Sequence, residues 1–349
     1  MFTQSLLDKT PAALKLVHNK LFYLLLGLSL LVMGNFATAH VRWFTDPNDP
    51  TLASFPAYAL TDAPVLIWTG IGVVIIAVAI FLEGRLPAIR IVDSKLRHDA
   101  IELMRILTGV SFLLTAYGGE LLAPHLTAFG AFGTGLVFLK AFIGILLISN
   151  RFIHHAAILM VLLWLGTVLQ HGFIKGFEYV NVVGIALFLY FNYTPDLDLR
   201  AKLKPYSVGV LRISTGMALV ALGFSEKLLG AALGQAFVAS FDWNFMQMLG
   251  LEWFTDQLFV LSAGMVEVVI GIIFILGVVT RLNTLAIAGM MLLSNIIFVI
   301  TGENDKALIE MIGHMPTIAT AIILLLLGGG QRLRLKKTDQ APVVEIKTA

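Results

Sequence analysis

Long apolar stretches alternate with short polar turns along almost the whole chain. A bilayer core of about 30 Å is crossed by roughly 20 apolar helical residues, and ten stretches come near that length. They fall at 21–40, 62–83, 101–119, 133–149, 153–171, 180–194, 207–230, 257–279, 282–301 and 310–329. The pattern predicts an all-α, polytopic membrane protein with about ten transmembrane helices.

The composition supports this prediction and narrows the chemistry. Of the 349 residues, 58% are hydrophobic and 13% are charged, whereas average soluble domains are about 45–50% apolar and about 25% charged. Such a chain is neither a disordered protein nor a nucleic-acid module, and its expected partner is the lipid bilayer. Because it contains no cysteine, disulfides, thiolate metal sites and cysteine-ligated clusters are excluded.

Basic residues collect on one side of the predicted spans. Most of the 24 Lys and Arg residues fall on the inner side when both termini are cytoplasmic, as the positive-inside rule requires. We therefore expect a multi-pass protein of the bacterial inner (plasma) membrane, with a disordered tail at 331–349. The aromatic outer loop 231–256, which contains Trp243, is either a partial lid or an ordinary aromatic belt.

An internal repeat divides the chain. Segment 105–120 (RILTGVSFLLTAYGGE) aligns with 212–226 (RISTGMALVALGFSE), and 140–144 (KAFIG) aligns with 267–271 (EVVIG). Both copies start on the inner side, so the repeats are parallel. The predicted parts are an N-terminal two-helix lead-in at 1–100, a first four-helix unit at 101–200, a second at 201–330 and a cytoplasmic tail at 331–349.

The second unit carries a spaced set of residues: Arg212, Gly223-Phe224-x-x-Lys227, Phe237, Trp243, Glu267-x-x-x-Gly271, Gly277-x-x-x-Arg281 and Gly313-His314-x-Pro316. In these it resembles the DoxX family of four-helix membrane proteins, and the first unit is a weaker copy. The resemblance implies two tandem DoxX-like four-helix bundles. Similar proteins include DoxD/DoxA-type thiosulfate:quinone oxidoreductase subunits, so it also implies a bound quinone and a redox partner subunit.

Two ionisable residues inside the membrane occupy equivalent positions of the repeat. A charge at the bilayer centre costs at least about 2.5–3.5 kcal/mol, so Lys140 and Glu267 are expected either to meet or to lie symmetrically about a shared cavity. They form a buried ion pair that fixes the register of the halves, or they belong to a substrate or proton path. Arg212, one turn inside the cytoplasmic face, is expected to snorkel or to pair with nearby acids. Glu226 and Lys227 point about 100° apart and do not pair with each other.

Polar residues also gather at the predicted outer face. Glu310 and His314 are spaced i, i+4 on one helical face, and His171 lies at the same level. Imidazole and carboxylate groups at this spacing permit a metal site. Two alternatives remain open, a polar pocket for an organic headgroup and the ordinary polar ends of helices.

Three functions follow from these observations. The first is a quinone-linked membrane subunit of a redox system, in which Glu267, Lys140 and Glu310 are the candidate catalytic residues and the carboxylates handle protons. Its candidate cofactor contacts are His314, Arg212, Glu226, Lys227 and Trp243. The second is a transporter or permease for a small solute or metal ion. The third is a non-catalytic membrane assembly factor.

Overall fold

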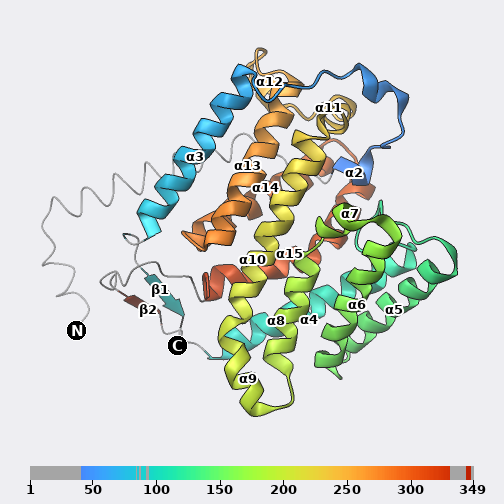
Figure 1. Cartoon of the computed structure of the whole chain (residues 1–349), viewed down its shortest axis with the longest axis vertical. Coiled ribbons are helices and arrows are strands. Elements are labelled where there is room, and N and C mark those ends of the chain that lie inside the picture. The colour runs from blue at the N-terminus through green and yellow to red at the C-terminus, as the bar shows by residue number, and fades with distance from the viewer. Residues whose placement is uncertain (1–40, 84, 86–87, 92–93, 331–342, 347–349) are drawn as a thin grey trace, which may run out of the picture.

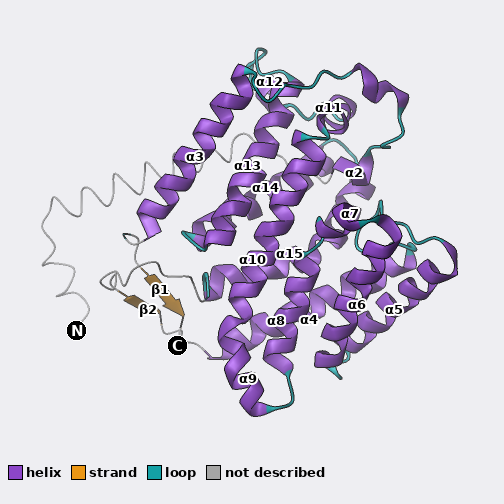
Figure 2. Ribbon diagram, in the orientation of Figure 1, coloured by secondary structure: helices purple, strands orange, loops and turns teal. Residues whose placement is uncertain are grey.

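The computed structural model describes residues 41–83, 85, 88–91, 94–330 and 343–346. Helices dominate this part of the chain (Figures 1 and 2). Eight of the described helical segments are long and apolar enough to cross a membrane, which confirms an all-α, multi-pass membrane protein. They are α3 (Ala63–Glu83), Lys95–Tyr117 of α4 (Ser94–Tyr117), α5 (Gly130–Ile148), α6 (Ile153–His171), Leu197–Leu228, α13 (Asp256–Leu276), α14 (Thr280–Ile300) and α15 (Asn304–Leu327).

The predicted number of ten spans is not confirmed. The first predicted span, 21–40, lies outside the described residues, and the span predicted at 180–194 is the shorter helix α8 (Asn181–Tyr193). The segment Leu197–Leu228 is a succession of four helical elements. They are α9 (Leu197–Leu203), η2 (Lys204–Tyr206), α10 (Ser207–Leu222) and the π-helix η3 (Gly223–Leu228).

Eight helices form a ring. Going round it, α4 packs on α5, followed by α6, α8, α10, α13, α14 and α15, which packs back on α4. The contact between α13 and α14 is the least extensive in the ring. The fourth helix of each predicted unit therefore packs against the first helix of the other unit, so the two units share one assembly.

An arginine near the start of the first helix in each unit holds the end of the second helix. Each guanidinium donates hydrogen bonds to two successive carbonyl oxygens there. Arg105 donates to the carbonyls of Leu147 and Ile148, and Arg212 donates to those of Phe274 and Ile275. Since the last carbonyls of a helix have no partner within it, the two arginines satisfy the same need at equivalent places.

Paired glycines let the first and second helices of each unit cross closely. A Cβ on Gly109 would lie 3.1 Å from the carbonyl oxygen of Gly144, and one on Gly216 would lie 2.5 Å from that of Gly271. Small residues at such crossings allow two backbones in a membrane to approach. The arginines and the glycines together set the register of the repeat, in which Lys140 is equivalent to Glu267.

One further long helix packs on the outside of the ring, and several short elements cover one end of it. Helix α3 packs along α13 (Figure 1), and many of its large apolar side chains are exposed, as lipid-facing residues are. The loops at 118–129, 172–180 and 229–255 lie at one end of the ring, here called the α2 end. The short elements there are α2 (Val41–Phe44), η1 (Pro50–Ser54), α7 (Phe173–Phe177), α11 (Ala231–Ser240) and α12 (Phe245–Met248).

A pair of short strands lies beside the ring, where β1 contacts α15. Strand β1 (Ala88–Ile91) pairs in parallel with β2 (Val343–Ile346). The expected disordered tail is therefore wrong for 343–346. Four consecutive residues with three β-branched side chains favour a strand once a partner is close, and the partner here comes from the distant segment that joins α3 to α4.

Candidate functional site

A cavity of about 100 Å³ lies in the centre of the ring. Its walls come from seven of the eight ring helices, all except α6, and from the α2 end of the molecule. Leu121 and Glu178 line it at the α2 end, while Thr284 and Leu324, close to the other ends of their helices, line it at the opposite end. The lining therefore extends over most of the thickness of the ring.

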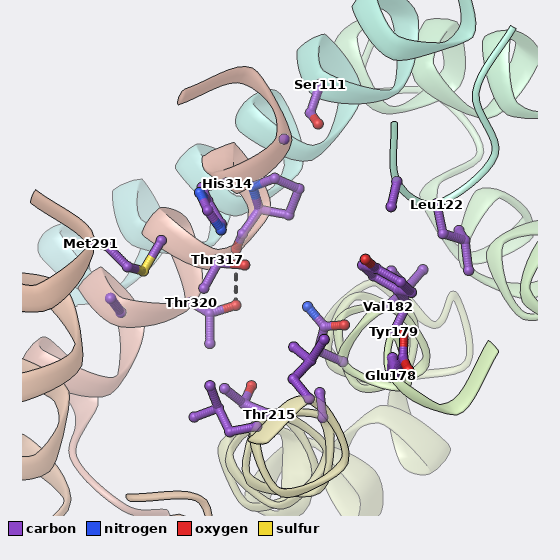
Figure 3. Close-up of a pocket in the computed structure, with 18 of the residues that line it drawn as sticks. Ser111, Leu122, Glu178, Tyr179, Val182, Thr215, Met291, His314, Thr317 and Thr320 are labelled. Atoms are coloured by element: carbon purple, nitrogen blue, oxygen red, sulfur yellow. Dashed lines mark hydrogen bonds between the residues drawn. The ribbon is translucent and has the colours of Figure 1, made fainter. Parts of the chain in front are cut away.

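The cavity has polar side chains on one part of its wall and apolar ones on another. His314, Thr317 and Thr320 come from α15, and Ser111 comes from the neighbouring α4 (Figure 3). A second group is apolar and comes mostly from α10 and α14: Ala218, Leu219, Leu222, Ile287 and Met291. Thr215 of α10 and Thr284 of α14 also line the cavity, so this part of the wall is mainly apolar but carries two hydroxyls.

Lys140 brings a positive charge to the polar side. It is 1% exposed and lines the cavity. Its ammonium donates one hydrogen bond, 2.9 Å long, to the backbone carbonyl of Glu120, and lies 5.7 Å from the centre of the Phe112 ring. In the described part of the chain, no carboxylate forms an ion pair with it.

Glu267, at the equivalent position of the second unit, is paired. Both of its carboxylate oxygens accept hydrogen bonds from the ammonium of Lys227, at 3.0 and 2.9 Å. Both side chains are buried. The prediction that Lys140 and Glu267 lie about a shared cavity describes the structure, because both line it; the alternative, that the two meet as an ion pair, is wrong. Glu267 takes its charge partner from its own unit.

Titratable groups around Lys140 add little further charge. Burial raises the pKa of the Glu120 carboxyl, although the charge of Lys140 opposes this. Burial lowers the pKa of His125, which stands near Tyr179, to about 3, so this imidazole is neutral at physiological pH. Burial also raises the pKa of Tyr179 well above 10, which keeps its hydroxyl neutral. Lys140 is therefore the main source of positive charge on the polar side.

Helix α2 covers the cavity at its own end. The Trp43 ring stacks on His314 with 5.1 Å between ring centres, and its indole nitrogen donates a hydrogen bond to the Tyr179 hydroxyl. Arg42 forms a 2.6 Å salt bridge with the buried Glu178. Gly313 makes the close approach possible, since a Cβ there would lie 2.4 Å from the Trp43 ring.

The remaining candidate cofactor contacts do not line the central cavity. The Arg212 guanidinium donates hydrogen bonds to two backbone carbonyls of α13 and to the carbonyl of Gly329. It neither snorkels nor pairs with an acid within the described residues. Glu226 is buried in η3 beside Lys227. Trp243 is 1% exposed and packs in an aromatic cluster, with its ring 4.7 Å from that of Phe298. Loop 231–256 therefore contributes a packed cluster beside the site.

The predicted metal ligands are not brought together. His314 lines the cavity, whereas Glu310 accepts a 3.2 Å hydrogen bond from Ser294 on the neighbouring helix. His171 packs edge-on against Phe129. No group of three His, Cys, Asp or Glu residues in the described ranges is arranged to hold a metal ion.

The residue-by-residue reading of the sequence missed several contributors to the site. Arg42 and Trp43 belong to the lead-in, which had no assigned role. Ser111 and Thr115 escaped notice because hydroxyl residues are common in membrane helices. Comparison of the two repeat copies contains a signal for them, since the second copy has Ala218 and Leu222 at those two positions. Comparison with known proteins adds no assignment: no family model, curated protein or solved structure matches this chain.

Proposed function

We propose that the protein transports a small solute across the membrane through the central cavity. The observation that carries this proposal is the extent of the cavity lining, from Leu121 and Glu178 at the α2 end to Thr284 and Leu324 at the opposite end. In many transporters built from internal repeats, the substrate site lies near the bilayer midplane at the interface of the repeats. This cavity lies between the two similar sets of helices.

The arrangement of the ring supports movement of one half against the other. The halves meet along α8 with α10 and along α15 with α4. Rocking at these two contacts widens one end of the cavity while it narrows the other. At the α2 end, passage also requires Trp43 to leave His314, which breaks one ring stack and the hydrogen bond to Tyr179.

The size of the cavity limits the solute. Its volume of about 100 Å³ is smaller than the roughly 150 Å³ engineered cavity that binds benzene. The solute therefore has only a few non-hydrogen atoms. Larger molecules enter only if the helices of the ring separate.

Uptake into liposomes that contain the purified full chain tests the proposal. Radiolabelled acetate, glycine, glycerol and urea serve as a panel of small solutes. We expect saturable uptake of at least one of them. Leu222→Trp fills the cavity from α10 and is expected to abolish this uptake, whereas Leu229→Trp, at an exposed position (81%), leaves it unchanged.

Either of two results contradicts transport. One is that no member of the panel enters faster than it enters protein-free liposomes. The other is that the Leu222→Trp variant, shown by gel filtration to be folded, transports at the wild-type rate.

A quinone-linked redox subunit is the second candidate, and the carboxylates at the cavity favour it. Glu178 and Glu267 both line the space, and Lys140 offers a donor to a quinone carbonyl oxygen. A quinone ring is larger than benzene, so this candidate requires the helices of the ring to separate around it. The isoprenoid tail would leave between α13 and α14, whose contact is the least extensive in the ring. A quinone takes up two electrons, supplied by a partner subunit, and two protons, supplied through the carboxylates, to form a quinol. The resemblance to DoxX belongs with this candidate.

Solvent extraction of the purified protein tests the second candidate. Expected results are a lipid-soluble quinone in the extract and saturable binding of a short-tailed quinone, which Leu222→Trp blocks. If the extract contains no quinone and the short-tailed quinone does not bind, this function is wrong.

A further inference from the structure

Lys140 is a buried cation whose hydrogen-bonding capacity is only partly used. An ammonium has three donors, and Lys140 spends one of them on the carbonyl of Glu120. The neighbouring charges facing the cavity are already neutralised, since Glu267 is paired with Lys227 and Glu178 with Arg42. A buried charge without compensation is costly, so the site gains most from a ligand that carries one negative charge.

The repeat shows that the first two helices of each unit differ in polarity where they line the cavity. In the first unit, Ser111, Thr115 and Lys140 line the cavity. The equivalent positions of the second unit also line it but carry Ala218, Leu222 and the paired Glu267. At these positions the first unit presents two hydroxyls and an ammonium, whereas the second presents two hydrocarbon side chains and a paired carboxylate. Thr215 of α10 and Thr284 of α14 add hydroxyls from the second unit.

The apolar side sets a second requirement for the ligand. Ala218, Leu219 and Leu222 of α10, with Ile287 and Met291 of α14, line the cavity. An inorganic anion gains nothing from this surface, whereas each buried CH₂ group of an organic anion contributes about 0.8 kcal/mol, which corresponds to roughly fourfold in affinity. The cavity volume of about 100 Å³ leaves space for only a short chain.

We infer that Lys140 binds the carboxylate of a short-chain monocarboxylate, whose hydrocarbon end lies against α10 and α14. This inference rests on the proposed transport function and names its class of solute. Ser111 and Thr115 bring hydroxyls to the same side of the cavity, and Glu267 plays no part in holding the anion because Lys227 occupies both of its oxygens.

Calorimetric titration of the detergent-purified full chain tests the inference. Acetate is the probe, acetamide is its uncharged counterpart of the same shape, and chloride is an anion without hydrocarbon. We expect saturable binding of acetate, tighter binding of propionate by about fourfold for the added CH₂ group, and much weaker binding of acetamide and chloride. Equal affinity for acetate and acetamide, or tighter binding of chloride than of acetate, overturns the inference.

Substitution of the lysine separates its charge from its bulk. Lys140→Met keeps a flexible side chain of similar length and removes the charge, so acetate affinity should fall at least about 30-fold, as when one partner of a buried charge pair is removed. Lys175→Met, at an exposed lysine of α7, is the matched control and should bind acetate like the wild type. Unchanged acetate affinity in Lys140→Met also overturns the inference.

Ser111→Ala gives a milder second variant, because the second unit already carries alanine at the equivalent position. It should bind acetate about tenfold more weakly, since a hydrogen bond to a charged group contributes about 1.5–3 kcal/mol. It keeps the proposal testable if Lys140→Met fails to fold, and wild-type acetate affinity in Ser111→Ala then counts against the site.

Binding and uptake together distinguish the inference from the proposed function. If acetate binds through Lys140 but no solute enters liposomes, transport is wrong and the monocarboxylate site stands. If glycerol or urea enters through the cavity while acetate does not bind, transport stands and the monocarboxylate site is wrong.

Discussion

The two units of the repeat hold their first and second helices together in the same way, but they carry different charges at the cavity. In both, an arginine holds the end of the second helix and a pair of glycines brings the helices together. At the cavity, however, the second helices carry opposite charges: the first unit has Lys140 where the second has Glu267. Glu267 forms an ion pair with Lys227, whereas the Lys140 ammonium donates its hydrogen bond to a backbone carbonyl and forms no ion pair within the described residues.

This difference shows how a duplicated scaffold acquires one binding site. A closed pair of buried charges holds two helices in register, and neither member is free to act on a ligand. An ammonium without an ion-pair partner contributes less to the fold and more to recognition. The second unit thus supplies support, and the first supplies the charged group of the candidate site.

The largest expected contrast comes from removing one charge on each side. Glu267→Gln leaves Lys227 buried without its carboxylate and should lower the free energy of unfolding by about 3–5 kcal/mol. Lys140→Met removes a charge that has no ion-pair partner and should leave that free energy unchanged or higher. Denaturant unfolding in detergent, followed by circular dichroism, measures both, with the exposed Glu252→Gln as control. Equal losses in the two variants would contradict the comparison.

Unlike the charged residues at the cavity, Arg105 and Arg212 are expected to contribute equally to the free energy of unfolding. Arg105→Met and Arg212→Met each leave helix-end carbonyls without donors, and each buried group left unsatisfied costs about 1–3 kcal/mol. We expect both variants to lose about 2–4 kcal/mol in the same unfolding measurement. Arg151→Met, at an exposed position, should be neutral. A large loss in only one of the arginine variants would show that the repeat is not symmetrical at these contacts.

Substitution of the glycines at the two helix crossings should destabilise the protein to different extents. A Cβ at Gly216 meets a backbone oxygen at 2.5 Å, whereas the closest atom at Gly109 is a side-chain carbon of Ile148 at 2.8 Å. A side chain can move more easily than a backbone, so Gly216→Ala should destabilise by about 1–3 kcal/mol and Gly109→Ala by less. Gly135→Ala, where nothing lies within 4 Å, is the control. The reverse order would show that α10 and α13 separate more easily than α4 and α5.

The smallest effect concerns pH and the Glu120 carboxyl. Burial raises the pKa of this carboxyl, so it is more often protonated near neutral pH than an exposed glutamate. As pH rises through that raised pKa, the carboxyl becomes an anion, neutralises part of the Lys140 charge and weakens acetate binding. We expect a decrease of about fivefold, which corresponds to roughly 1 kcal/mol. Acetate titrations from about pH 5.5 upward, where the ligand is already ionised, check it, and the decrease should be smaller in Glu120→Gln; an equal decrease in that variant would show that another group is responsible.

Much of the fold followed from local patterns. Apolar runs of membrane-spanning length do not depend on tertiary context, because every backbone polar group in a bilayer must be satisfied within a helix or a closed barrel. Most of the long helices therefore begin and end near the predicted bounds, although α4 and α15 begin earlier, at Ser94 and Asn304, than the predicted starts at 101 and 310. The short helices α7, α9, α11 and α12 were not predicted. The tail strand β2 escaped prediction because four residues form a strand only when a distant partner is present, here β1.

Only some residues of the candidate site could be predicted from the sequence. Lys140 and Glu267 stood out because charged groups inside a membrane are rare, and His314 stood out by its i, i+4 spacing from Glu310. All three line the cavity. Arg212, Glu226 and Trp243 also looked unusual, yet tertiary packing directs them to carbonyls, to η3 and to an aromatic cluster. Residue type does not reveal which side of a helix faces a partner.

By itself, the sequence determined a membrane protein with a duplicated helical unit and a few costly charges within the bilayer, because hydrophobicity and repetition are properties of the chain alone. The tertiary structure decided which charges meet. Glu267 pairs with Lys227 of its own unit. Lys140 has no ion-pair partner in the part of the chain that the structure describes, and Trp43 of the lead-in covers His314. Those outcomes depend on interatomic distances of a few ångströms between segments far apart in sequence, and only the closing of the helix ring sets these distances.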